Sequence, residues 1–116
     1  MGRKVALFAF NGETMCFVHV LINAIDMVER NYDVKLIIEG AACRQVKELS
    51  DPEKPFSNIY RKVVELGILD CVCKACSNKM GSLDSALEQN LNICGELGGH
   101  PSIARYMEDG YEVLTF

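Results

Sequence analysis

Short apolar segments alternate with longer segments of helical pattern, and this alternation limits the fold of the chain more than any other feature. Residues 4–10 (KVALFAF) and 34–40 (VKLIIEG) are apolar without polar alternation, which predicts strands that are covered on both faces. Residues 68–74 form a third such segment, and 91–94 and 111–116 are weaker ones. Strands that alternate with helices predict an α/β fold with a mostly parallel sheet and helices on both faces.

The segments between these strands carry apolar residues at helical spacing. Residues 15–29 are apolar on nearly every side, so we expect a helix covered by the sheet and by a second surface, either another layer or a partner subunit. Further helices are predicted over residues 41–49, 55–66, 82–89 and 101–109. Because the chain has no internal repeat and a suitable length, residues 1–116 are predicted to form a single domain.

Charge and hydropathy exclude several classes of function. The net charge of −4 argues against nucleic acid as a partner and, more weakly, against anionic membranes. The apolar run at residues 14–25 is shorter than the ~20 residues that span a bilayer, and residues 2–13 lack a signal-peptide cleavage site. We therefore expect a cytoplasmic protein whose cysteines are reduced and form no disulfide framework.

The segment CVCKAC, residues 71–76, holds three of the six cysteines. Cys71 and Cys73 are predicted on the same face of a strand, and Cys76 in the turn toward the next helix. The partial positive charge of a helix N-terminus, together with Lys74, favours a thiolate. Cys73 is therefore expected to be the most reactive thiol, followed by Cys76. Packing explains two thiols at such a junction poorly.

The other cysteines have a simpler interpretation. A cysteine in apolar sequence is usually a small buried hydrophobic residue, and we expect this of Cys16, Cys71 and Cys94. For Cys43, in the short helix after the second strand, the reactivity is left undecided. A zinc site made of Cys43, Cys73, Cys76 and His100 is an alternative, although no spacing in the sequence requires it.

His100 lies in a glycine-rich loop that leads into the last predicted helix. From there its imidazole is placed to approach the strand ends and take the proton of Cys73. The alternatives are a helix cap or a subunit interface. Glu13 and Glu39, both at predicted strand ends, are candidates for the same cleft, although lone carboxylates are more often solvated. No G-x-G-x-x-G motif occurs, so no nucleotide or flavin cofactor is expected.

Four stretches carry a resemblance to a known family: KVALFAFNGE, VKLIIEGAA, CKACSNKMG and HPSIARYMEDGYEVLTF. In their order and spacing the chain resembles the DsrE/DsrF-like family of small sulfur-relay proteins. The resemblance implies an α/β/α fold with a parallel sheet of about five strands, and homo-oligomers, commonly trimers or hexamers. It also implies a persulfide on the cysteine matched by Cys73, with Gly81 at the family's spacing. Family members commonly have arginine or other basic residues after this cysteine, and here the stretch SNKM, residues 77–80, has only Lys79.

Two classes of function follow. The first is a sulfur-relay protein that carries sulfane sulfur as a persulfide on Cys73, with Cys76 as a candidate second thiol and His100 beside them. Its partners would be sulfur donor and acceptor proteins. The second is a non-enzymatic oligomeric module whose cysteine cluster binds a metal or senses redox state. The sequence assigns no resident cofactor or metal in the first class.

Overall fold

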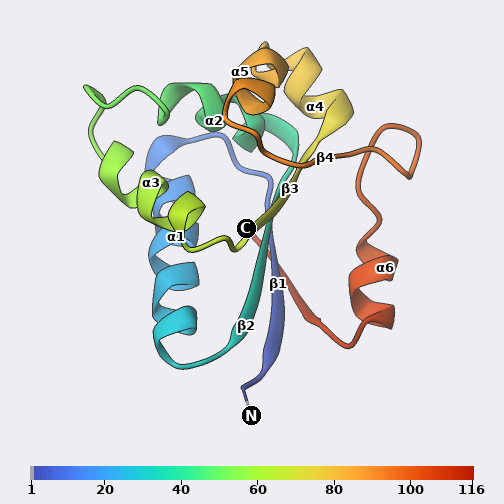
Figure 1. Cartoon of the computed structure of the whole chain (residues 1–116). Coiled ribbons are helices and arrows are strands. Elements are labelled where there is room, and N and C mark those ends of the chain that lie inside the picture. The colour runs from blue at the N-terminus through green and yellow to red at the C-terminus, as the bar shows by residue number, and fades with distance from the viewer. Residues whose placement is uncertain (1) are drawn as a thin grey trace.

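The computed structural model describes residues 2–116 and contains one five-stranded sheet (Figure 1). The strand order is β4-β3-β2-β1-β5, and all neighbouring strands are parallel. The strands are β1 Lys4–Ala9, β2 Asp33–Ile38, β3 Leu69–Cys73, β4 Ile93–Cys94 and β5 Glu112–Thr115. The predicted α/β fold with a parallel sheet of about five strands is therefore confirmed.

The helices lie where the sequence predicts them, with two differences. They are α1 Thr14–Glu29, α2 Arg44–Glu48, α3 Ser57–Glu65, α4 Lys74–Lys79, α5 Leu83–Glu88 and α6 Ile103–Glu108. The helix predicted over residues 41–49 divides into a 3-10 turn, Gly40–Cys43, and α2. Helix α4 begins directly after β3, where a turn was expected, so Cys76 lies within a helix. No helix among residues 2–116 is long and apolar enough to cross a membrane.

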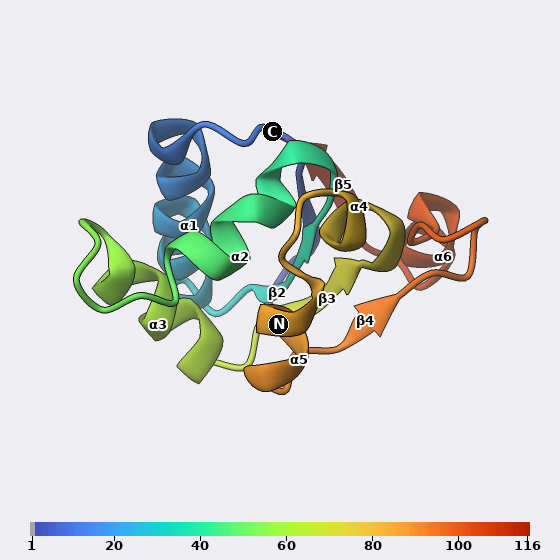
Figure 2. The same ribbon diagram turned by 90° about the horizontal axis from the view of Figure 1, so that it is seen from above.

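The two faces of the sheet are covered unequally (Figures 1 and 2). One face packs against α1, α2, α3 and α5, and its core includes Leu7, Leu36, Phe17 and Leu21, all fully buried. The opposite face is covered by α6, which supplies Tyr106. Burial of apolar side chains on both faces, at roughly 25 cal/mol per Å², explains the absence of polar alternation in β1 and β2.

The parallel arrangement brings the carboxyl ends of β1, β2 and β3 to the same edge of the sheet. Helices α2, α4 and α5 lie at this end of the molecule (Figure 1). Glu39 follows β2 directly, and Cys73 is the last residue of β3. In parallel α/β sheets this edge is where ligands bind, and it is the edge that carries the candidate site.

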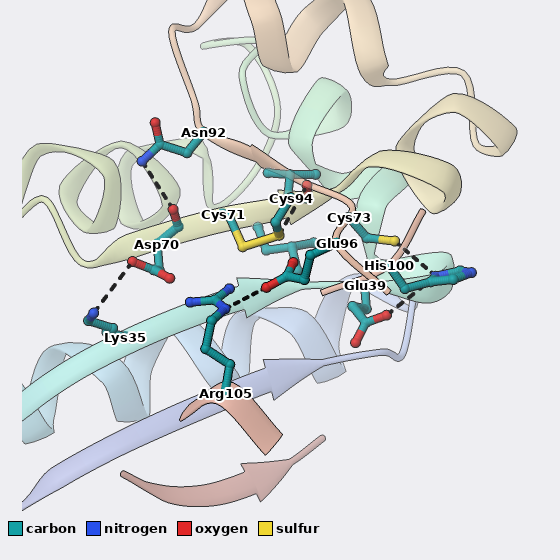
Figure 3. Close-up of a disulfide and its surroundings, with 12 residues drawn as sticks. Lys35, Glu39, Asp70, Cys71, Cys73, Asn92, Cys94, Glu96, His100 and Arg105 are labelled. Carbon is teal, nitrogen blue, oxygen red and sulfur yellow. Dashed lines mark hydrogen bonds and ion pairs between the residues drawn. A yellow bond between two sulfur atoms is a disulfide. The ribbon is translucent and has the colours of Figure 1, made fainter. Parts of the chain in front are cut away.

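A disulfide joins Cys71 to Cys94, two cysteines that were expected to be reduced and packed in the core (Figure 3). Strand β4 pairs with β3 so that Cys94 lies opposite Cys73. Cys71, further back along β3, then lies 5.8 Å from Cys94 between Cα atoms, which is the usual spacing for a disulfide. The sequence could not show this pairing because it depends on the register of a strand of two residues.

Cys71 and Cys73 do not share a face of the sheet, contrary to the prediction from strand alternation. Cys71 packs beside Tyr106 on the face covered by α6, and Cys73 belongs to the core cluster on the opposite face. The period of two holds only within an extended strand. Cys73 is also the residue at which the chain turns into α4, so its side chain departs from the alternation.

Candidate functional site

Four side chains meet at the carboxyl ends of β2 and β3: Glu39, Cys73, Cys76 and His100. Their carboxylate, thiol and imidazole atoms all lie within 4.8 Å of one another. We call these four residues the thiol cluster. Figure 3 shows Glu39 and Cys73 pointing toward the ring of His100. The sequence analysis proposed three of the four as candidate catalytic residues, and the structure brings these three together.

The C-x-x-C segment forms the first turn of α4. Cys73 is the N-cap residue, and its Sγ accepts a hydrogen bond from the backbone N–H of Cys76 at 3.4 Å. A side chain at the N-cap normally accepts from this position because the first N–H groups of a helix lack partners within the helix. The turn brings both sulfur atoms to one place. Cys73 is fully buried and Cys76 is partly exposed.

The loop over residues 95–100 carries His100 to the thiols. Leu97 and His100 form an antiparallel bridge, with N···O distances of 2.8 and 3.0 Å. Ala75 donates its backbone N–H to the carbonyl of Gly99 at 2.9 Å, which fixes the loop to the start of α4. Gly99 has a φ of +98°, and a Cβ there would lie 3.1 Å from the Cβ of Ala75. This position therefore requires glycine.

His100 contacts the other three residues of the thiol cluster through a single atom. Its Nδ1 lies 3.2 Å from the Sγ of Cys73 and 3.7 Å from the Sγ of Cys76. The same nitrogen lies 3.7 Å from Oε1 of Glu39. The structure thus places His100 beside Cys73, where the sequence analysis expected it. The catalytic roles of Cys73, Cys76 and His100 stay predictions.

Glu39 is more central than the sequence suggested. Only 7% of its surface is exposed, whereas Glu13 is exposed and lies outside the cluster. Burial raises the pKa of the Glu39 carboxyl, and the nearby His100 opposes this shift. The sequence shows that Glu39 follows the second strand. It does not show that this strand is the neighbour of β3, which is what places Glu39 beside Cys73.

Burial dominates the electrostatics of Cys73. It raises the pKa of the thiol to about 12, although the N–H of Cys76 acts in the opposite direction. Burial therefore favours the protonated thiol, which argues against the expected thiolate at Cys73. That Cys73 is the most reactive thiol stays an untested prediction. Helix α4 has only six residues. Its N-terminal charge does not outweigh removal of the sulfur from water.

Two further cysteines differ from their expected roles. Cys43 does not join the thiol cluster. It is fully buried, its Sγ donates to the carbonyl of Ile38 at 3.4 Å, and burial raises its pKa. Cys16, expected to be buried, is exposed on α1. Cys43 is buried because its side of the 3-10 turn faces the core, and Cys16 is exposed because its side of α1 faces away from the core.

A family model described as the DsrE/DsrF-like family matches residues 3–116. The chain belongs to the DsrE/DsrF-like family. The resemblance noted in the sequence is thereby confirmed over nearly the whole chain. Membership supports a role of the sulfur-relay type in general. Within this DsrE/DsrF-like chain, Gly81 lies just after α4 and has a φ of +73°. The glycine at the family's spacing from Cys73 therefore lies at the end of the helix that Cys73 caps.

Relatives of this DsrE/DsrF-like chain occur in archaea. An uncharacterized protein of Methanocaldococcus jannaschii is 29% identical over 96 residues, which are 83% of this chain and 76% of that protein. An uncharacterized protein of Archaeoglobus fulgidus is 60% identical over 37 residues, which are 32% of this chain and all of that protein. A solved structure of a conserved protein of unknown function from Bacteroides thetaiotaomicron has a TM-score of 0.63 at 14% identity. It covers 96% of this chain and 94% of its own, and it supports the fold alone.

Proposed function

We propose that this protein carries sulfane sulfur as a persulfide on Cys73, with Cys76 as the second thiol. The main observation in support is the 3.2 Å contact between the Sγ of Cys73 and Nδ1 of His100, in a chain of the DsrE/DsrF-like family. A nucleophilic sulfur needs a base within hydrogen-bond reach. His100 meets this requirement for a thiol that burial keeps protonated.

Loading of sulfur would exchange one bond between sulfur atoms for another. Cys73 Sγ attacks the terminal sulfur of a donor persulfide, a new S–S bond forms, and the donor thiolate leaves. His100 Nδ1 accepts the Cys73 proton, and the departing thiolate takes up a proton in turn. The donor loses a sulfane sulfur and regains its thiol, so the step involves no net oxidation and needs no further reagent.

Cys76 offers two ways to unload the sulfur. If its Sγ attacks the outer sulfur of the Cys73 persulfide, the sulfane sulfur moves to Cys76 and Cys73 regains its thiol. If it attacks the inner sulfur, a Cys73–Cys76 disulfide forms and the outer sulfur leaves as hydrogen sulfide. In that second case two thiols are oxidised and one sulfane sulfur is reduced, so the electrons balance.

Access to Cys73 sets a condition on this proposal. Cys73 is fully buried, and the loop over residues 95–100 contacts it through the carbonyl of Gly99 and the ring of His100. A donor therefore reaches Cys73 only when this loop moves away. Opening of the loop requires the loss of the backbone hydrogen bond from Ala75 to Gly99.

We also propose that the protein works as a homo-oligomer, a trimer or hexamer by family resemblance, with sulfur donor and acceptor proteins as transient partners. Large apolar side chains on the surface support assembly. Met15 and Ile22 on α1 are 51% and 47% exposed, and Leu114 and Phe116 near the edge strand β5 are 43% and 38% exposed. Apolar surface of this kind is often covered by another subunit.

Intact-mass measurement after treatment with inorganic polysulfide tests the persulfide. The experiment uses metal-free protein with Cys16→Ser, because Cys16 is an exposed thiol that would itself take up sulfur. The Cys16→Ser protein should gain one sulfur atom that dithiothreitol removes. The added Cys73→Ser change should abolish the gain. The added Cys76→Ser change should leave the sulfur bound for longer, because the thiol that releases it is absent.

Two results would contradict the proposal: no gain in the Cys16→Ser protein, or an equal gain after Cys73→Ser. Circular dichroism of each variant distinguishes loss of the site from loss of the fold. An absence of sulfur uptake with an intact fold would favour the alternative, a non-enzymatic module that binds a metal or senses redox state.

A further inference from the structure

The thiol cluster combines side chains that bind metal ions with high affinity. It provides two thiol sulfur atoms, one imidazole nitrogen and one carboxylate, all within 4.8 Å of one another. Structural and catalytic zinc sites draw their ligands from these three chemical groups. The four residues come from β2, β3, α4 and the loop over residues 95–100, so the fold and not one short motif assembles them.

Three of the six distances within the cluster are close to the edges of a coordination tetrahedron, and the other three do not exceed 4.8 Å. Ligand bonds of 2.0–2.3 Å to zinc place neighbouring ligand atoms roughly 3.3–3.8 Å apart. The three measured contacts of His100 Nδ1, to Cys73 Sγ, Cys76 Sγ and Glu39 Oε1, are 3.2, 3.7 and 3.7 Å. A cation between these atoms needs only small side-chain movements to reach all four.

The backbone at the C-x-x-C segment also suits a bound cation. The N–H of Cys76 points at the Sγ of Cys73 at 3.4 Å, so a donor is already directed at the sulfur. Hydrogen bonds of this kind stabilise the negative charge of a thiolate ligand and fix its orientation. The same turn leaves the two sulfur atoms adjacent.

Glu39 supplies an independent observation. Its side chain is only 9% exposed, and within residues 2–116 the only basic side chain within 4.0 Å of its carboxylate is His100. A buried carboxylate without a lysine or arginine partner is costly unless a cation compensates it. Sulfur relay at Cys73 does not require a carboxylate at this place, so the proposed persulfide leaves Glu39 unexplained.

We propose that Glu39, Cys73, Cys76 and His100 bind one thiophilic divalent metal ion of the zinc class. The ligand atoms are one carboxylate oxygen, the two Sγ atoms and Nδ1 of His100. The ion replaces the two thiol protons, which pass to solvent, and no electron transfer occurs. Cys43, which the sequence offered as a fourth ligand, is replaced by Glu39.

The metal-bound form would be closed to thiol chemistry. A sulfur atom that is bound to the cation is a poorer nucleophile than a free thiolate, and the loop over residues 95–100 is then held by the bond through His100. Metal binding would therefore protect Cys73 and Cys76 from modification and leave Cys16, outside the cluster, reactive. This inference does not rest on the proposed persulfide, because metal content and sulfur uptake are measured separately.

Titration with cobalt(II) tests the site. Reduced protein is freed of metal with a chelator and titrated without oxygen. Tetrahedral cobalt with thiolate ligands absorbs strongly in the red and shows charge-transfer absorption in the near ultraviolet. We expect one cobalt ion per chain, displaced by zinc. Glu39→Gln, His100→Gln and Cys76→Ser should each lower the affinity by about tenfold or more, and Cys16→Ser should leave it unchanged.

The cobalt titration has outcomes that would contradict the proposed site. No tetrahedral cobalt spectrum, or a spectrum unaffected by both Glu39→Gln and His100→Gln, contradicts the four-ligand site. In the second case the two thiols alone bind the ion. A second readout is iodoacetamide labelling of the zinc-loaded protein, in which Cys76 should be protected and Cys16 should not. Circular dichroism checks that each variant is folded.

Discussion

At the scale of the residue, burial and the N-terminus of α4 have opposite effects on the pKa of the Cys73 thiol. The sequence places Cys73 correctly at a junction between a strand and a helix, beside Cys76. It does not show that the loop over residues 95–100 covers the sulfur, because that contact joins segments more than 20 residues apart. The predicted position is right, whereas burial argues against the predicted thiolate.

The order of alkylation follows from this burial. In native protein we expect Cys16 to react first with iodoacetamide, Cys76 next, and Cys73 and Cys43 last, because Cys16 is exposed and the last two are fully buried. Timed labelling followed by peptide mapping measures the order, with denatured protein as the reference for intrinsic reactivity. Faster labelling of Cys73 than of Cys76 would show that the loop is open most of the time.

Tyr111 gives a prediction about alkaline pH. It is 8% exposed and donates a hydrogen bond to Asp33, and burial raises its pKa to about 12 from a usual value of 10.0. A raised pKa in the folded state stabilises the protein fully below pH 10, and this stability is lost as the pH rises toward about 12. Tyr111→Phe removes the ionisable group.

Urea unfolding at several pH values measures this effect. Between about pH 10 and pH 12 the free energy of unfolding should fall less steeply in Tyr111→Phe than in the wild type. Some slope should remain, because burial raises the pKa of Tyr60 and Tyr106 as well. Equal slopes in the two proteins would show that Tyr111 ionises as readily in the folded state as in the unfolded state.

At the scale of the element, the strands were predicted well and the short segments less well. The strands β1, β2 and β3 have continuous apolar sequences, and burial on both faces makes such sequences easy to recognise. Helix α4 and strand β4 have six and two residues. Elements this short are held by tertiary contacts, such as the backbone bond from Ala75 to Gly99, so local sequence does not define them.

The disulfide between Cys71 and Cys94 should stabilise the edge of the sheet. It closes a loop with a sequence separation of 23 residues, for which the loss of chain entropy in the unfolded state predicts about 3 kcal/mol. Replacing both cysteines by alanine should lower the free energy of unfolding by about this amount. The measurement is urea unfolding without reductant.

Reductant provides the matched control for this prediction. Dithiothreitol should destabilise the wild type and leave the protein with Cys71→Ala and Cys94→Ala unchanged. Cys16→Ser, which removes an unpaired cysteine, should respond to dithiothreitol as the wild type does. A wild type that is equally stable with and without dithiothreitol would mean that this bond contributes little to folding.

At the scale of the whole molecule, the sequence predicts the class of fold, while the distribution of helices around the sheet comes from the structure. The alternation of strands and helices is local information, and a parallel sheet is its usual consequence. The unequal layers, with α6 supplying the helical cover on one face, follow from the strand order. That order also decides that Glu39 joins the thiol cluster.

For the whole molecule we predict that the chain forms a homo-oligomer. Light scattering at micromolar concentration should give a multiple of the chain mass of 12.9 kDa. Ile22→Glu places a charge on the exposed side of α1 and should shift the protein toward smaller species. Leu87→Glu, a matched change on α5, should have a smaller effect. A monodisperse wild-type monomer would count against the oligomer.

The positions of β4 and β5 at opposite edges of the sheet bear on the order in which the protein is built during synthesis. A chain that leaves the ribosome from its N-terminus can pair β1, β2 and β3 early, which brings Glu39, Cys73 and Cys76 together. His100 lies between β4 and α6, on the segment that must cross from one edge of the sheet to the other. That crossing is complete only when β5 pairs with β1. The imidazole is therefore the last of the four groups to reach its place, and a nascent chain would expose both thiols before the loop covers them.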